Sequence, residues 1–155
     1  MGFSPDLVWI KQRNAAENHF LTDSVRGAGL HLRSDQTTAE SNTSATFTSF
    51  DVDGFSLTGS GSAVPQVNDS GDTYVAWGWD AGSGSPVSNT DGSITSTVKA
   101  NPSYGFSIAT YTGNGTASGE SFGHGLTQRP DMVIVKNRTS ATSWNVLFPD
   151  FMTAT

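Results

Sequence analysis

The sequence predicts an all-β protein built as an antiparallel two-sheet β-sandwich. Three observations lead to this prediction: few helix-forming residues, many short segments of strand length, and turn residues between those segments. Roughly a quarter of the 155 residues are Ser or Thr, 17 are Gly and only 14% are charged. Amphipathic helices instead need many Glu, Lys, Arg, Ala and Leu residues. Many short strands are best accommodated in two packed antiparallel sheets.

The strand signals are of two kinds. Residues 7–10 and 132–135 are continuous apolar runs that end in a charged segment, which is typical of central strands covered on both faces. In residues 73–79 the large Val75, Trp77 and Trp79 share one face, whereas the small Ala76 and Gly78 share the other. The remaining predicted strands are residues 30–32, 46–48, 106–111 and 144–148.

Turn chemistry separates these segments. Asp53 and Gly54 stand between Phe50 and Phe55, and they predict a hairpin because both residues tolerate positive φ. Residues 68–71 and 114–115 carry similar Asn, Asp and Gly signals.

One segment of the chain recurs 125 residues later. Residues 5–13, PDLVWIKQR, return as residues 130–138, PDMVIVKNR, with Pro, Asp, Val, Lys and Arg in the same register. Further along, Ala16 matches Ala141, and the apolar Leu21 matches Val146. Internal similarity at a fixed spacing indicates a repeat. The sequence therefore predicts an internal repeat of about 125 residues, with one full period and the opening of the next.

This repeat suggests three parts of the chain. Residues 1–84 are predicted to be a first β-sandwich repeat that lacks its first hairpin. Residues 85–103 follow a Gly- and Ser-rich stretch and are predicted to be a linker, part of which packs on the sheet through Ile94 and Val98. Residues 104–155 contain the opening strands of the next repeat. They can also fold back to complete the first sandwich, which would otherwise leave an apolar sheet edge open.

Charge and composition exclude several partners. The formal net charge is -6 and the sequence pI is about 4.7, so there is no basic surface for nucleic acid. No apolar run approaches the roughly 20 residues that a bilayer-spanning helix needs, so we expect no membrane insertion. Cysteine is absent, which removes disulfides, thiolate metal sites and cysteine nucleophiles.

The residues that could carry chemistry do not form a recognisable pattern. His19, His31 and His124 have unrelated neighbours, and no His-x-x-x-His pair suggests a metal site. A Gly-x-Ser-x-Gly pattern occurs at residues 119–123, but no helix-forming segment follows it, as a nucleophile elbow requires. The acids Asp23, Asp35, Glu40 and Glu120 cannot be placed across a cleft from sequence alone. We therefore expect no catalytic residue, no cofactor and no enzymatic activity.

Two sets of residues remain as candidate binding sites. Asp51 and Asp53 flank Val52 and could offer oxygens to calcium, but the other ligands of an EF-hand loop are missing, so a hairpin turn is the favoured interpretation. Exposed aromatic rings stack on sugars, and the candidates for glycan binding are Trp9, Trp77, Trp79 and Trp144. All four lie in strand patterns, where large aromatic residues more often belong to a core.

The order of the motifs resembles a known family. PDLVWIKQR, HFLTDSVRG, TSFDVDGFSL, DTYVAWGWDAG, VSNTDGSITSTVKANPSYGFSIATYTGNGT and GHGLTQRPDMVIVKNRTSATSWNVLF together resemble a repeat domain of tail-fibre-like and other virion structural proteins of marine tailed bacteriophages. The resemblance covers nearly the whole chain. It implies a jelly-roll or concanavalin-like sandwich, often in tandem, and it brings no catalytic residues.

The resemblance leads to a functional expectation. We expect a non-enzymatic virion structural protein, in a fibre, a tail appendage or a capsid-surface decoration, located at the virion surface or outside the cell. Its expected partners are its own copies, as a homo-oligomer with a trimer favoured by analogy, and other virion proteins. Contacts are expected through sheet edges or loops. The alternative is a lectin-like module that recognises a host surface glycan, in a phage fibre or in a secreted bacterial protein.

Overall fold

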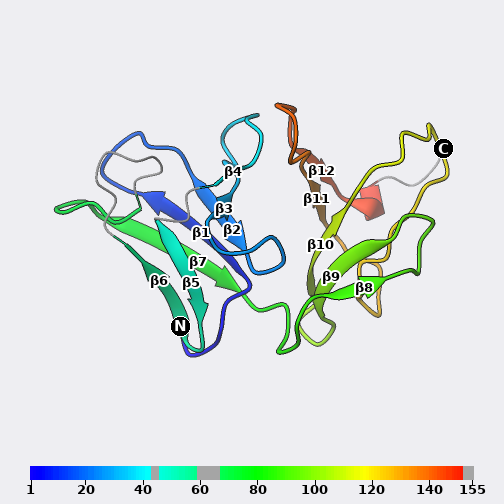
Figure 1. Cartoon of the computed structure of the whole chain (residues 1–155), viewed down its shortest axis with the longest axis horizontal. Coiled ribbons are helices and arrows are strands. Elements are labelled where there is room, and N and C mark those ends of the chain that lie inside the picture. Colours follow the sequence, from blue (N-terminus) through cyan, green and yellow to red (C-terminus); the bar gives the residue numbers. More distant parts are fainter. Residues whose placement is uncertain (43–45, 59–66, 152–155) are drawn as a thin grey trace.

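The computed structural model describes residues 1–42, 46–58 and 67–151, and this part of the chain is all-β (Figure 1). It contains several small antiparallel sheets and one short 3-10 helix, Pro149–Phe151. The strands are β1 Leu7–Gln12, β2 Phe20–Asp23, β3 Leu30–His31, β4 Ser41–Asn42, β5 Phe47–Asp51, β6 Gly54–Leu57, β7 Tyr74–Trp79, β8 Val87–Asn89, β9 Ser96–Asn101, β10 Phe106–Tyr111, β11 Val133–Val135 and β12 Asn145–Leu147. The all-β prediction is thus confirmed, and each predicted strand overlaps an observed one.

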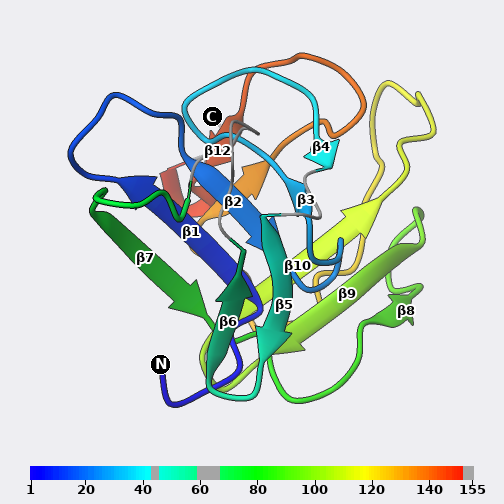
Figure 2. The same ribbon diagram turned by 60° about the vertical axis from the view of Figure 1, so that its left-hand side comes forward.

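The first sheet has the order β2-β1-β7, with both pairings antiparallel. β1 is central, as its continuous apolar run predicts. Its Val8 and Ile10 are almost fully buried on one face, together with Phe20 of β2. The β5–β6 hairpin covers this face through Phe47, and lies in front of the sheet in Figure 2. These aromatic and branched side chains form the main hydrophobic core.

The β5–β6 hairpin forms where it is predicted, but its turn is different. Phe50 pairs with Phe55 and Asp51 pairs with Gly54, so Val52 and Asp53 are the two loop residues. Neither loop residue has positive φ, and Gly54 lies in β6. The expectation that Asp53 and Gly54 form the turn with positive φ is therefore wrong by one residue.

The tryptophans of β7 lie on the opposite face of the first sheet. Trp77 pairs with Trp9 and Trp79 pairs with Leu7, whereas Ala76 pairs with the buried Ile10. The small residues of β7 therefore face the core side. The indole N–H of Trp9 donates to Nδ1 of His19 at 2.8 Å.

The second sheet has the order β10-β9-β8, and it contacts this face of the first sheet through Trp79. Trp79 stacks on Phe106 of β10, with ring centroids 6.3 Å apart. β8 and β9 lie within residues 85–103, the segment predicted to be a linker, and Val98 of β9 is buried. Gly82 has φ +99, and a Cβ there would lie 2.9 Å from the carbonyl oxygen of Ala100. Only glycine allows the connection to pass so close to β9.

Asp6 joins the two sheets. Its side chain is almost fully buried just before β1, and it accepts hydrogen bonds from the Ser24 hydroxyl and from the backbone N–H of Ala81 at 2.8 Å. Lys99 of β9 completes the set with an ion pair at 2.6 Å. A buried carboxylate is tolerated only when it is paired and hydrogen-bonded in this way.

We predict that Asp6→Ala lowers the free energy of unfolding by about 3–5 kcal/mol, because it leaves the Lys99 ammonium and two donors without their acceptor. Urea denaturation measures the change. Asp131→Ala is the matched control, since Asp131 occupies the corresponding place 125 residues later but is exposed. Its substitution should cost less than about 0.5 kcal/mol. Equal losses in the two variants would contradict the role of Asp6.

His31 is a buried titratable group beside the core. It is 2% exposed and stacks on Phe20 with ring centroids 4.9 Å apart. Burial, reinforced by the charges of Arg33 and Arg26, lowers the pKa of His31 from 6.5 to about 4. The folded protein therefore holds this imidazole neutral at pH values where an unfolded chain protonates it.

The stability of the protein should consequently fall as the pH is lowered. The unfolded state binds a proton below about pH 6.5 and the folded state does so only near pH 4, so the contribution of His31 is complete above pH 7 and is lost through this window. Between pH 7 and pH 5 the loss should be about 2 kcal/mol, measured by urea denaturation. The His31→Gln variant should show a weaker dependence of the free energy of unfolding on pH, and the His124→Gln variant should show the same dependence as the unaltered protein. An unchanged slope in His31→Gln would refute the assignment.

The C-terminal hairpin pairs β11 with β12 in a sheet of two strands. In Figure 2 it lies behind the first sheet, away from the β5–β6 hairpin. Ile134 is 54% exposed and Val146 is 50% exposed. Residues 132–135 were predicted to form a central strand, and that prediction is wrong within the described residues, because no third strand pairs with β11 there. No helix in the ranges that the structure describes is long and apolar enough to span a membrane.

Candidate functional site

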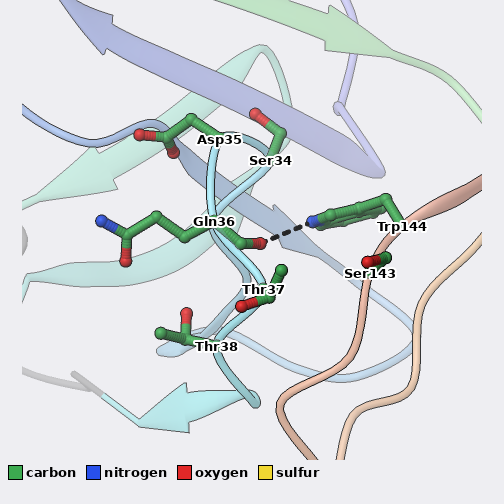
Figure 3. Close-up of a pocket in the computed structure, with 7 residues that line it drawn as sticks. All are labelled: Ser34, Asp35, Gln36, Thr37, Thr38, Ser143 and Trp144. Carbon is green, nitrogen blue, oxygen red and sulfur yellow. Dashed lines mark hydrogen bonds between the residues drawn. The ribbon is translucent and has the colours of Figure 1, made fainter.

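An open groove lies where the C-terminal hairpin meets the loop that follows β3 (Figure 3). Its volume is about 470 Å³. The lining residues are Ser34, Asp35, Gln36, Thr37, Thr38, Ser143 and Trp144. One wall is therefore a polar loop, and the other is the residue pair that precedes β12.

Trp144 is fixed across this junction by its indole N–H. The N–H donates to the backbone oxygens of Arg33 and Gln36, each at 3.0 Å. Both acceptors belong to one turn, in which the N–H of Gln36 also bonds to the oxygen of Arg33 at 3.2 Å. The indole is half-buried, so part of the ring remains available at the groove.

The segment that leads into β2 holds the loop of residues 33–38 in place. Asp35 accepts a hydrogen bond from the backbone N–H of His19 at 3.0 Å. Gln36 donates to the Asn18 side chain at 2.6 Å. The groove is thus supported by the segment that leads into β2, and its polar wall does not depend on the hairpin alone.

An ion-pair network lies next to the groove and crosses the same junction. Arg138, from the C-terminal hairpin, binds both carboxylate oxygens of Glu40 at 3.0 and 2.8 Å. Arg26 binds Glu40 at 2.9 Å and also pairs with Asp23. In addition, the N–H of Glu40 donates to the backbone oxygen of Arg138 at 2.9 Å. Bidentate arginine–carboxylate pairs fix geometry as well as contributing energy.

These arginines determine the charge state of Glu40. Burial raises the pKa of Glu40, but the hydrogen bonds from Arg138 and Arg26 outweigh it and hold the pKa below its usual value. The same contact raises the pKa of Arg138. Glu40 and Asp23 were acids that sequence alone could not place. The structure brings both acids to Arg26, which pairs with each of them.

The other acids in that group lie apart from this network. Asp35 is exposed at the groove, and Glu120 accepts a bond from the Ser93 hydroxyl, which lowers the pKa of Glu120.

The four tryptophans proposed for glycan binding lie in three places. Trp9 and Trp77 form an outward pair with ring centroids 5.6 Å apart, and Trp77 is 45% exposed. Trp79 packs on Phe106, and Trp144 alone lines the groove. None of the four is fully buried. Trp144 therefore has a fixed ring beside the side chains of Thr37 and Ser143, as a sugar site needs (Figure 3).

Asp51 and Asp53 lie at the tip of the β5–β6 hairpin. The side chain of Asp51 accepts bonds from Ser56 at 2.6 Å and Ser49 at 2.7 Å, and these bonds lower the pKa of Asp51. The backbone oxygen of Asp53 accepts a bond from the N-terminal ammonium. Across the residues placed by the structure, no three His, Asp or Glu side chains are grouped so that they could hold a metal ion.

Sequence reasoning missed the polar wall of the groove. The loop 33–38 carried no motif, and Arg138 was noted only as a position in the repeat. Trp144 was identified from the sequence only as an aromatic side chain that could stack on a glycan. Its partners come from more than 100 residues earlier in the chain, and no local pattern reports such contacts.

The described part of the chain is an all-β domain with an open groove beside Trp144. The whole chain, residues 1–155, matches one family, described as a domain of unknown function (DUF7483), and the chain belongs to that family. No curated protein and no solved structure matches it.

We predict that Trp144→Phe loosens the C-terminal hairpin, because it keeps an aromatic ring and removes the N–H donor. The loss of this interaction should amount to about 1 kcal/mol and should appear as faster hydrogen exchange of the β11 and β12 amides. Trp9→Phe also removes an indole N–H bond, but within the first sheet, and should leave these amides unchanged. Unaltered exchange in Trp144→Phe would contradict the docking role.

Proposed function

We propose that the chain is a β-sandwich repeat module of a structural protein that works through protein–protein contacts. It contains one period of about 125 residues and the opening hairpin of the next. The observation that carries the proposal is that the β11–β12 hairpin reproduces the β1–β2 hairpin, both in pairing register and in local hydrogen bonds.

The registers correspond residue by residue. Val8 pairs with Thr22 in the first hairpin, and Val133 pairs with Leu147 in the second. The next two pairs, Trp9 with Leu21 and Ile10 with Phe20, correspond to Ile134 with Val146 and Val135 with Asn145. A shift of 125 residues relates every pair. Register in a hairpin depends on the loop and on the side chains of both strands, so agreement in all three pairs supports a shared origin.

The lysine that follows each first strand adds independent support. The ammonium of Lys11 donates to the backbone oxygens of Gln12 and Ala15. The ammonium of Lys136 donates to those of Asn137 and Ser140, again 125 residues on. The identity of these lysines was visible in the sequence, but their shared use in closing the hairpin loop was not.

Contacts between the two copies favour a structural role. Trp144 and Arg138 belong to the second copy, and their acceptors belong to the first. A unit in which the next copy is already docked can propagate as an array, since each repeat contacts its neighbour. The packing of the β5–β6 hairpin on the β2-β1-β7 sheet supports the proposal that the first unit is a sandwich.

The setting we propose is a tailed bacteriophage virion, in a fibre, a tail appendage or a surface decoration. This part of the proposal is supported by the resemblance of the ordered motifs and by the contacts between copies. Its partners are further copies of the chain, with a trimer as the favoured assembly, and neighbouring virion proteins.

A second function is favoured by the groove at Trp144. Its ring can stack on a sugar, and the hydroxyls of Thr37 and Ser143 can hydrogen-bond it. The wide opening of the groove suits an exposed glycan chain rather than a small buried ligand. A lectin-like role would use this groove for receptor recognition.

One set of measurements separates the two functions. We expect light scattering and negative-stain electron microscopy of the purified chain to show trimers or filaments, and a glycan array to show no competable signal. A protein that stays monomeric at about 100 µM and gives an array signal that is lost in Thr37→Trp would instead establish the lectin function. That substitution fills the groove and keeps the Trp144 hydrogen bonds. Val52→Trp, at the exposed hairpin tip, is the matched control.

A further inference from the structure

Among the strands that the structure describes, none pairs with the outer edge of the C-terminal hairpin at β11. β11 pairs with β12 on one side, and within residues 1–42, 46–58 and 67–151 no strand pairs with its other side. Apolar side chains crowd this hairpin: Met132, Ile134, Val146, Leu147 and Phe148 are each between 39% and 54% exposed. An open edge with exposed apolar residues is a template for another strand.

The first hairpin indicates which strand fits this edge. β1 corresponds to β11, and its equivalent edge is occupied by β7 in antiparallel register. There, Gly78 and Ala76 lie opposite Val8 and Ile10, and Trp77 lies opposite Trp9. The corresponding positions on β11 are Val133, Val135 and Ile134. They too present two branched residues on one face and a large apolar residue on the other.

We propose that the free edge of β11 binds a strand of the β7 type, with small residues opposite Val133 and Val135 and a large aromatic residue opposite Ile134. The inference rests on the correspondence between the hairpins described under the proposed function. The bound strand would rebuild, on the second hairpin, the three-stranded β2-β1-β7 arrangement of the first. Main-chain hydrogen bonds would provide the affinity, and the alternating side chains would provide the specificity.

The hydrogen-bonding direction of this strand can be assigned. The N–H of Arg13 donates to the oxygen of Thr73, so these residues form a hydrogen-bonded pair. Such pairs alternate along an antiparallel ladder, so Trp9 with Trp77 is also a hydrogen-bonded pair. The N–H of Trp77 therefore points towards β1, and the N–H of Ala76 points away. A β7-type strand on β11 should use the same set of N–H groups.

The test uses the full chain and a fluorescent synthetic peptide with the sequence of residues 72–81. We expect saturable binding by fluorescence anisotropy. A peptide N-methylated at the position of Trp77 should bind at least tenfold more weakly, whereas one N-methylated at Ala76 should bind like the parent peptide. In the protein, Ile134→Lys should weaken binding at least tenfold, and Val52→Lys, at an exposed apolar site on another hairpin, should not.

Three results would overturn the proposal. They are the absence of binding at about 1 mM peptide, equal binding of the two methylated peptides, and a dimer of the protein that Ile134→Lys dissociates, because a second β11 then occupies the edge. These outcomes are separate from the test of the proposed function. A monomeric chain can bind the peptide, and a trimeric or filamentous chain can fail to do so.

Discussion

The buried carboxylate of Asp6 is the interaction on which the arrangement of the sheets depends. It lies at the entry to β1 and binds Ser24, Ala81 and Lys99, which come from the end of β2, the end of β7 and the second sheet. Because a buried carboxyl group is costly unless it is paired and hydrogen-bonded, these contacts stabilise the arrangement of the three segments. One side chain thereby links three segments, the most distant of which lies 93 residues along the chain from Asp6.

The first sheet uses its two faces differently. Its core face carries Val8, Ile10 and Phe20 under the β5–β6 hairpin. The opposite face carries the indoles of Trp9 and Trp77, which pair with each other and lie beside His19. The indoles of Trp9 and Trp77 thus lie outside the main core, and both remain only partly covered.

The junction between the two hairpins combines two kinds of interaction. Trp144 contributes a directional hydrogen bond to backbone oxygens, and Arg138 contributes a bidentate ion pair to Glu40. Both come from the C-terminal hairpin and end on residues 33–40. These contacts fix the hairpin beside the loop 33–38, and the groove lies between the two.

By itself, the sequence determined the all-β class, the location of most strands and the central place of β1, because apolar patterning and turn residues are local properties. The tertiary structure alone decided that Asp6 is buried while Asp131 is exposed, although the two share one motif. It also decided that Trp144 meets Arg33 and Gln36, and that the strands of residues 85–103 form a sheet. Burial, pairing partners and groove walls depend on residues distant in the chain, and local patterns carry no information about which distant residues will meet.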